Sequence, residues 1–408
     1  MMSVLRTGLL VAVLAADLAC SSLQAADDID VHLSAIARTG PGGRGSVAAR
    51  AARERLSREG LDLLPQLLEA MNTKNIVAAN WYRSVYEDIT RRELAADPAA
   101  KFPVSFLKQY VSNPKHQGRV RRLVLDLIDR LEPGYSKSLI PGLIDDPEFR
   151  DEAVAVALVR GDNAKKAGQL KRAIAAYESA FRSARNPSQV SSAAGKLKSV
   201  DRQVSVVAHM GFVTDWFFLG PFDAPGTTGF DLVLPPEKQV ATGVVLKDTY
   251  KGKGGGRIGW KRFQTPDPFG QTNLIQVIAP VKEAVGYAYT EINSPRNQTV
   301  QLRCGADDNI TVWINGKQVL RRLQWLNGTR LDRFRVNVTL RKGNNRMLVK
   351  VCQGPQHKNP AVPNNWSLQL RLCDAAGGGV GVTNGLPPLA RTGAVDLRRR
   401  IAIKESVR

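Results

Sequence analysis

The sequence has few cysteines, few aromatic residues, a shortage of acidic residues and no long apolar run beyond its first residues. Its 408 residues include 4 Cys and 6% aromatics, and 58 Lys+Arg against 37 Asp+Glu give a formal net charge of +21. So few cysteines exclude a disulfide-stapled miniprotein, and the missing apolar runs exclude a polytopic membrane protein. A hydrophobic content of 43% suits ordinary globular domains, and the length suggests about two or three of them.

Signatures of catalysis are missing as well. The chain contains no His-Glu-x-x-His, no Gly-x-Ser-x-Gly and no Cys-x-x-Cys, the patterns of metalloproteases, serine hydrolases and redox enzymes. Its four histidines are dispersed and form no ligand spacing: His32, His116, His209 and His357. We therefore expect a protein that is not an enzyme. A hydrolase with an unrecognised site would require two carboxylates in a cleft, about 5–10 Å apart.

The N-terminus carries the pattern of an export signal. Arg6 is followed by the apolar run 8–16, which Asp17 interrupts, and small residues precede a cleavage site that would remove residues 1–25. Such a run is too short for a bilayer span, which needs about 20 residues. We expect a periplasmic or extracellular protein. Lipid attachment at Cys20 is the less favoured alternative, because Asp17 places a charge where a lipid-attachment motif has an apolar residue.

Residues 30–204 are rich in Ala, Leu, Arg and Glu, and their apolar residues recur at helical spacing. Prolines near the starts of three short helices lie 38 residues apart, at positions 65, 103 and 141. Proline costs little there because its missing N–H would be unpaired anyway. A second helix follows each of them, over 80–93, 119–132 and 149–161. Helix pairs at this period resemble degenerate HEAT repeats, which bury their apolar faces by stacking.

The segment Gly168–Phe181 followed by Pro187 resembles one tetratricopeptide (TPR) hairpin. Gly168 and Ala173 are small where the helices approach, while Tyr177 and Phe181 fill the groove. Together the two resemblances imply that 30–204 is an α-solenoid that docks a protein partner. A packing scaffold without a partner is the alternative.

From residue 211 the pattern changes to short β-rich runs between turns. These runs are 212–222, 240–246, 275–278, 285–292, 299–304, 310–314, 334–340, 347–352 and 366–372. Val300, Leu302 and Cys304 alternate with Gln301 and Arg303, and Leu368, Leu370 and Leu372 alternate with Gln369 and Arg371. The apolar sets should point inward and the polar sets outward. We expect an all-β jelly-roll sandwich over 211–374, and hence a multidomain α + β chain.

Residues 305–317, Gly-Ala-Asp-Asp-Asn-Ile-Thr-Val-Trp-Ile-Asn-Gly-Lys, combine an aspartate pair, an alternating strand and an Asn-Gly hairpin. They resemble the core motif of the protective-antigen-type β-sandwich, a fold related to the jelly-roll accessory domains of glycoside hydrolases. The segments 219–222 and 340–351 support this resemblance.

The resemblance implies a calcium ion held by Asp307 and Asp308, with Asn309 as a further candidate, and in contact with sugar hydroxyls. Adjacent carboxylates supply hard oxygens of the kind calcium prefers. The alternative is that the pair only shapes its loop, because Asp side chains readily bond to backbone in turns.

Further ligand candidates are an aromatic and two arginines. Trp216 and Trp366 lie in apolar strands and should be core, and Trp313 should face the other side of its strand. Trp325 is the candidate sugar platform, or else an anchor of its own loop. Arg321 and Arg322 belong to the part of the chain after residue 205, which has an excess of basic residues, with 28 basic against 14 acidic ones. Such a surface attracts polyanions, although a generally basic composition explains it equally well. No nucleic-acid-binding motif accompanies the charge.

Two expectations concern the end of the chain. Cys304 should point inward, and Cys352 and Cys373 are the best disulfide pair if their strands are neighbours. Residues 375–408 are rich in Gly and Pro and then basic, so we expect a disordered tail.

These patterns indicate an exported, non-catalytic binding protein. The sandwich would recognise a cell-surface or extracellular glycan or acidic polysaccharide, and the solenoid would dock a protein partner. Apart from calcium, no cofactor is implied. The alternative is a structural assembly protein whose two domains make only protein contacts, for which Trp313 and Trp325 would be buried.

Overall fold

A computed structural model describes residues 28–96, 101–325, 328–359 and 361–387. The chain divides into two compact units, one ending at Ala157 and the other beginning at Leu158. The predicted signal peptide, Cys20 and positions 388–408 lie outside the described residues. Within the described part, no helix combines the length and apolarity that crossing a bilayer would require.

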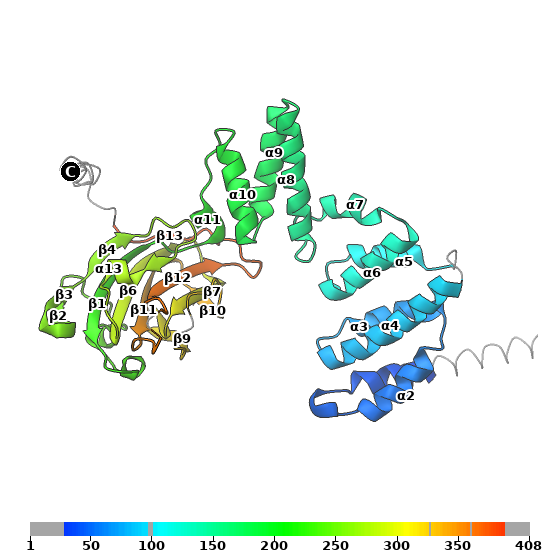
Figure 1. The fold of residues 1–408 in the computed structure, drawn as a ribbon, viewed down its shortest axis with the longest axis horizontal. Coiled ribbons are helices and arrows are strands. Elements are labelled where there is room, and N and C mark those ends of the chain that lie inside the picture. Colours follow the sequence, from blue (N-terminus) through cyan, green and yellow to red (C-terminus); the bar gives the residue numbers. More distant parts are fainter. Residues whose placement is uncertain (1–27, 97–100, 326–327, 360, 388–408) are drawn as a thin grey trace, which may run out of the picture. The chain divides into compact units, whose positions relative to one another are not determined.

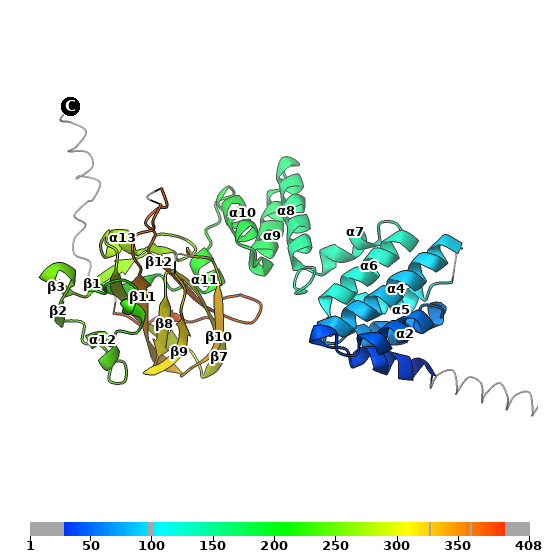
Figure 2. The ribbon, with the colours of Figure 1, turned by 60° about the horizontal axis from the view of Figure 1, so that its bottom comes forward.

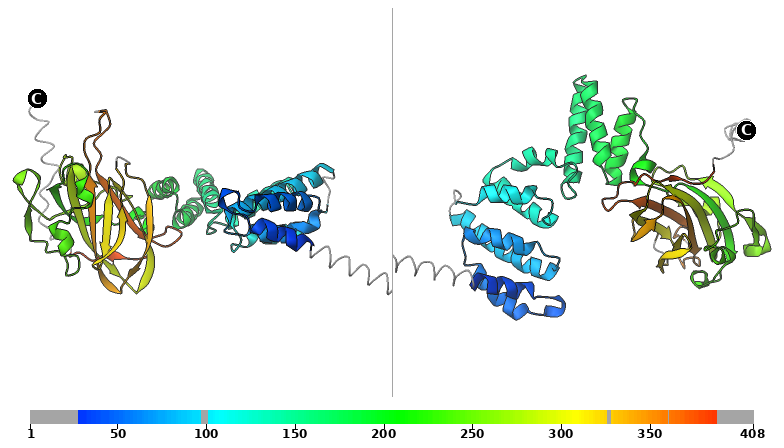
Figure 3. Two further views of the ribbon diagram at one scale, coloured as in Figure 1. Left: turned by 90° about the horizontal axis from the view of Figure 1, so that it is seen from below. Right: turned by 180° about the vertical axis from the view of Figure 1, so that it is seen from behind.

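The first unit is helical, as predicted (Figures 1 and 3). After a helix over 28–37 its elements are α2 (Ser46–Leu56), α3 (Leu64–Met71), α4 (Ile76–Ala96), α5 (Val104–Ser112), α6 (Gly118–Leu131), α7 (Tyr135–Leu139) and the first part of α8 (Arg150–Lys166). Helix α3 packs on α4, and α5 on α6. Leu64, Leu67 and Leu68 are fully buried in the shared core, as their helical spacing predicts.

The three prolines do not occupy equivalent places. Pro65 lies in the first turn of α3, and Pro103 directly precedes α5. Pro141, however, lies in a 3₁₀ turn, Ile140–Gly142. That turn directly follows α7, so Pro141 lies at the end of a short helix. The prediction of a proline near a helix start is therefore wrong at this third position.

The second unit begins with the last turns of α8, followed by α9 (Leu170–Ser183) and α10 (Pro187–Lys198). Helices α9 and α10 pack on each other, but the prediction that Gly168 allows their close approach is wrong. Nothing lies within 4 Å of a Cβ position at Gly168, whose φ of 71° places it in the turn before α9. The close approach is instead at Gly161 in α8. A Cβ at Gly161 would lie 2.4 Å from the ring of Tyr177. The Tyr177 hydroxyl donates to Asp162 over 2.8 Å, and Lys196 pairs with the same carboxylate over 2.6 Å.

Gly161→Ala is expected to destabilise the protein by about 1–3 kcal/mol. The substitution improves helix propensity, but the added methyl would overlap a ring that is 1% exposed and tethered by its hydroxyl. Gly195→Ala in α10 is the matched control, because nothing lies within 4 Å of its Cβ position. That variant should be stabilised by about 0.5–1 kcal/mol. Urea unfolding of both variants checks the pair, and equal stabilisation of both would contradict the close approach.

The rest of the second unit consists mainly of antiparallel strands (Figures 1 and 2). In the described residues the larger sheet has the order β4-β1-β6-β11-β8-β9, with β13 also on β6, and the smaller has the order β10-β7-β12-β5. Their bounds are β1 (Asp215–Asp223), β4 (Lys261–Gln264), β5 (Thr272–Asn273), β6 (Ala284–Ser294), β7 (Gln298–Asp307), β8 (Ile310–Ile314), β9 (Lys317–Arg322), β10 (Phe334–Leu340), β11 (Gly343–Gln353), β12 (Ser367–Cys373) and β13 (Thr383–Asn384). A small ribbon of β2 (Thr249–Lys251) and β3 (Arg257–Gly259) and the short helices α11 (Val206–Met210), α12 (Pro235–Lys238) and α13 (Leu274–Val277) complete it.

The two larger sheets share one apolar core and thus form a β-sandwich. Leu302 from the smaller sheet and Val349 from the larger are both fully buried in it. Trp216 and Trp366 are also core residues at 1% exposure, as predicted, and so is Cys304. The alternation of the strands therefore predicted correctly which side chains face inward.

A second apolar cluster covers the outer face of the larger sheet. Trp313, 8% exposed, packs there with Phe222 and Phe230, so it faces away from the sandwich core, as expected. Beneath the same cover, Lys350 is 1% exposed, and its ammonium pairs with Glu237 over 2.9 Å. Such a face is normally exposed to water, but here the segment between β1 and β4 buries it.

The predicted Cys352–Cys373 disulfide is wrong. Its premise was that the two strands are neighbours, but Cys352 lies on β11 of the larger sheet and Cys373 on β12 of the smaller. Both, like Cys304, are buried free thiols. Burial raises the pKa of Cys304 and Cys352 to about 12, so these groups are inert thiols rather than nucleophiles.

The expectation of a disordered tail is wrong for 375–387. Strand β13 pairs with β6, and Gly379 bridges to Cys373. A Cβ at Gly379 would lie 2.2 Å from the carbonyl oxygen of Ala208. The glycines here therefore allow close backbone approach to α11, which composition alone does not distinguish from flexibility.

Candidate functional site

The predicted aspartate pair lies where β7 passes into β8. Asp307 is the last residue of β7, and Asp308 and Asn309 connect it to β8. The peptide bond between the two aspartates is cis. Their exposures are 5% for Asp307, 2% for Asp308 and 0% for Asn309. Three adjacent polar side chains are therefore buried at one end of the sandwich.

Hydrogen bonds hold this connection against two neighbouring segments. The Asp308 amide donates to the Cys352 carbonyl, and the Cys352 amide donates to the Asn309 carbonyl, each over 3.0 Å. On the other side, the Gln324 side-chain amide donates to the Asp308 carbonyl over 2.7 Å. The aspartate pair is thus held rigidly between the end of β11 and the segment that follows β9.

The two carboxylates interact with each other and with backbone amides. Asp307 accepts from the Gly328 amide over 3.2 Å, and Asp308 from the Gly354 amide over 2.7 Å. Burial, followed by the charge of Asp308 and a hydrogen bond with it, raises the pKa of Asp307 to about 7. Near neutral pH the pair therefore tends to hold one shared proton, as expected of two adjacent buried carboxylates.

Trp325 lies beside this pair, as a ligand-binding role would require. It is partly exposed, and its ring packs against Gly354. A Cβ on Gly354 would lie 2.9 Å from the Trp325 ring and 3.0 Å from the Asp308 carboxylate. The indole and the carboxylate therefore flank the same glycine.

The two arginines predicted as ligand-binding residues face different ways. Arg321 pairs with Asp231 over 2.5 Å, and its guanidinium lies 3.7 Å from the centre of the Phe230 ring. Arg322 is exposed and lies over Phe334 at 6.0 Å. Because Arg322 pairs in register with Ile310, it lies near the end of the sandwich that holds the aspartates. Arg321 is directed toward other partners.

The donor chemistry of the pair fits calcium, which takes hard oxygen ligands. A bound cation would displace the shared proton and neutralise two buried carboxylates. In the part of the chain that the structure describes, no group of three or more His, Cys, Asp or Glu side chains could hold a metal. Further ligands would therefore be backbone oxygens, water or hydroxyls of a bound molecule. The side-chain nitrogen of Asn309 is buried without a hydrogen-bond partner among the described residues, but as a donor it cannot bind a cation.

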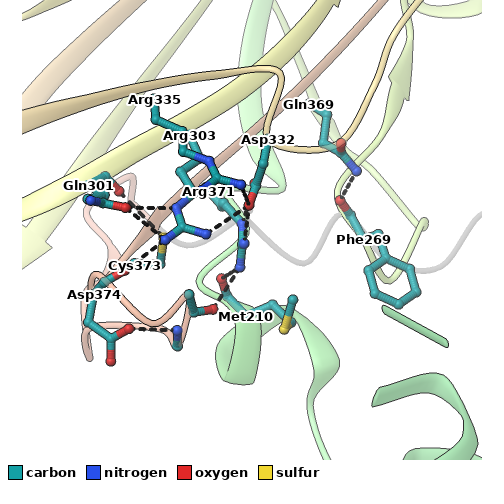
Figure 4. A network of polar contacts seen from close by, with 12 residues as sticks. Met210, Phe269, Gln301, Arg303, Asp332, Arg335, Gln369, Arg371, Cys373 and Asp374 are labelled. Atoms are coloured by element: carbon teal, nitrogen blue, oxygen red, sulfur yellow. Dashed lines mark hydrogen bonds and ion pairs between the residues drawn. The ribbon is translucent and has the colours of Figure 1, made fainter. Parts of the chain in front are cut away.

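A second polar cluster lies on the outer face of the smaller sheet (Figure 4). Arg303 and Arg371 are opposite each other on β7 and β12 and are 6% and 3% exposed. Both bind Asp332: Arg303 Nη1 lies 2.9 Å and Arg371 Nε 2.7 Å from its carboxylate oxygens. Burial opposes ionisation of Asp332, but the arginines outweigh it and lower its pKa.

The same arginines also bind backbone carbonyls of the segments that cover them. Arg371 donates to Met210 and Gly377, and Arg303 to Ala375. Because their donors are occupied within the chain, this cluster is structural. Strand alternation predicted the outward direction of Arg303 and Arg371 correctly, but it did not predict that other segments cover this face. The signal it missed is the acidic residue at 332, the one Asp or Glu between 309 and 373.

Comparisons with known proteins yield only distant structural similarities. No family model matches the chain, and no curated protein matches it. Among solved structures, the PA14 sugar-binding domain from an RTX adhesin is 14% identical, with 42% of this chain and 91% of that chain covered and a TM-score of 0.20. The PA14 domain of the MpAFP antifreeze protein is 15% identical, with coverages of 26% and 55% and a TM-score of 0.20.

A β-glucuronidase from an uncultured Clostridium sp. is also 15% identical, with coverages of 40% and 29% and a TM-score of 0.25. The chain spans less than two thirds of the antifreeze domain and of the glucuronidase. TM-scores this low do not demonstrate a common fold.

Proposed function

We propose that this protein is an exported, non-catalytic glycan-binding protein. Its sandwich is of the protective-antigen jelly-roll type, and the loop of Asp307 and Asp308 binds calcium and a sugar. The helical region, a HEAT/TPR-like solenoid, docks a protein partner. One observation supports the sugar site above the others: two adjacent buried carboxylates, one with a raised pKa, lie beside a partly exposed tryptophan.

A loop that is only structural would not need two buried carboxylates. One carboxylate is enough to anchor the loop to another segment, and Asp308 does so by accepting from the Gly354 amide. A second buried carboxylate whose pKa is raised to about 7 costs stability once it ionises. A bound cation removes that cost, which makes the pair more useful as a ligand set than as a loop anchor.

In this mechanism Asp307 and Asp308 would hold the ion, which supplies a Lewis-acidic centre for sugar hydroxyls when bound. The backbone donors of Gly328 and Gly354 orient the carboxylates. Trp325 offers an apolar ring face against which a sugar can pack, since its indole adjoins the same glycine as Asp308. To hold an ion, Asp307 would have to give up the proton that its raised pKa favours.

The alternative function is structural assembly through protein contacts alone. The burial of Trp313 at 8% favours it, because this tryptophan then serves packing rather than recognition. The partial exposure of Trp325 favours glycan binding.

The test is binding of the full chain to a panel of neutral and acidic polysaccharides, with calcium or with EGTA. Asp308→Asn and Trp325→Ala should each weaken calcium-dependent binding by about tenfold or more, or about 1.4 kcal/mol. Asp231→Asn is the control, since that carboxylate is 82% exposed on another segment, and it should leave binding unchanged. Absence of calcium-dependent binding to every polysaccharide would reject the sugar site and favour the assembly protein.

A further inference from the structure

A groove of about 400 Å³ lies at the other end of β8, between the two sheets of the sandwich. Strand β9 is the edge of the larger sheet and β10 the edge of the smaller, and the two lie close to each other (Figure 2). Ile310 follows the aspartate pair, whereas Ile314 lines the groove. Four residue steps along a strand span roughly 13 Å, so the groove is separate from the Asp307–Asp308 loop.

The floor of the groove is apolar and its rim is polar. Ile314, Val319 and Val338 line it and also pack against the sandwich core. The remaining lining side chains are three carboxamides, one hydroxyl and two cations, namely Asn315, Gln318, Asn337, Thr339, Lys317 and Arg341. No acidic side chain and no aromatic ring is among the described residues that line it.

Most of this rim has no partner within the described chain. Lys317, Gln318, Asn337, Thr339 and Arg341 are exposed, and none of their side chains makes a hydrogen bond or ion pair with another described residue. Asn315 differs, because its amide binds Asn345 and the Arg346 backbone. Elsewhere on the sandwich, by contrast, Arg262, Arg303 and Arg371 are each paired with an aspartate.

We propose that this groove binds an anionic saccharide, namely a carboxylated or sulfated sugar unit of an acidic polysaccharide. The apolar floor accepts the face of a sugar ring, and carboxamides and a hydroxyl both donate to and accept from sugar hydroxyls. Lys317 and Arg341 pair with the carboxylate or sulfate. Because no aromatic platform contributes, charge supplies much of the affinity, and binding is salt-dependent and independent of calcium.

An acidic peptide is the competing ligand, because two edge strands offer unpaired backbone groups to an added strand. The edge strand β9 carries Lys317, Arg321 and Arg322 along its short length. Charges placed on an edge in this way hinder strand addition. The observations therefore favour a ligand that is recognised by side chains, as a saccharide is.

The experiment uses the full chain in EGTA, with polygalacturonate and dextran sulfate as carboxylated and sulfated probes, and neutral dextran as the uncharged control. We expect the Lys317→Gln/Arg341→Gln double variant to lose about tenfold or more in affinity for at least one charged probe at about 50 mM NaCl. The wild-type chain should lose most of its binding at about 300 mM NaCl. A Lys251→Gln/Lys261→Gln variant removes the same charge from two exposed positions outside the groove and should change affinity less than about twofold.

Equal losses in the two double variants would overturn the proposal, because binding would then follow net charge alone. The proposal would also be overturned, in favour of an acidic peptide, if polyglutamate bound as tightly as the charged polysaccharides and the same groove variant weakened its binding. As a separate single variant, Asn337→Asp adds a repulsive charge to the rim and should also weaken binding of the charged probes relative to the wild-type chain. Asp308→Asn should leave binding in EGTA unchanged, because the groove does not use calcium. A wrong proposal for the calcium site would therefore affect only calcium-dependent binding, and a wrong proposal for this groove only the binding measured in EGTA.

Discussion

Asp332→Asn is expected to destabilise the protein by about 3–5 kcal/mol. Asn has nearly the same shape, and it tolerates the positive φ of 55° found at this position. The substitution therefore removes charge with little change in packing or backbone. It leaves Arg303 and Arg371 buried at 6% and 3% exposure without the carboxylate that compensates them, which is the costly way to break a buried ion pair.

Asp231→Asn is the matched control for this prediction. It breaks an aspartate–arginine pair in which the carboxylate is 82% exposed, so we expect a change below about 1 kcal/mol. Urea unfolding of the full chain at pH 7 measures both variants. Similar small effects in both would mean that the buried cluster contributes little to stability. The contribution of Asp332 should also fade in acid, because its lowered pKa means that its stabilisation is lost as falling pH protonates it.

Calcium is expected to stabilise the protein more at pH 8 than at pH 6. Burial and the adjacent Asp308 raise the pKa of Asp307 to about 7, so at pH 6 an entering ion must displace a proton. The apparent affinity should therefore rise about fivefold from pH 6 to pH 7 and about tenfold from pH 6 to pH 8, and level off above that. Without calcium the sign is opposite: the folded chain binds this proton more tightly than the unfolded chain, and stability falls as pH rises through about 7.

Thermal unfolding of the full chain at pH 6, 7 and 8, with calcium or EGTA, measures both trends. Asp307→Asn has no proton to release at this position, so it should lose the pH dependence near 7. It should also lose most of the calcium effect. An equal calcium effect at all three pH values, or an unchanged pH dependence in Asp307→Asn, would contradict the shared proton and with it the ion site.

Local patterns predicted much of the fold and part of the candidate site. Helical spacing located the apolar face of α3, and alternation located the inward residues of β7 and β12, because both periodicities follow directly from backbone geometry. The aspartate pair and Trp325 were identified separately, 17 positions apart. That they flank one glycine, Gly354, depends on the end of β11, which no local pattern places beside them.

The errors share one physical cause. Alternation determines which side of a strand a residue faces, but not which other segment covers that side. Arg303, Arg371 and Lys350 alternate as surface residues should, yet two covering layers bury them. The order of strands in a sheet also depends on long-range contacts. Cys352 and Cys373 lie in β11 and β12, which follow each other in the chain but belong to different sheets.

By itself, the sequence determined the change from helix to strand near residue 211, the inward faces of both regions and the chemistry of the aspartate pair. These depend on short-range geometry and on residue type. Only the tertiary structure decided which outer faces are covered, that 375–387 joins the sandwich, and that the edges β9 and β10 enclose a basic groove. Those features arise from packing between segments far apart in the chain, where burial depends on what lies opposite.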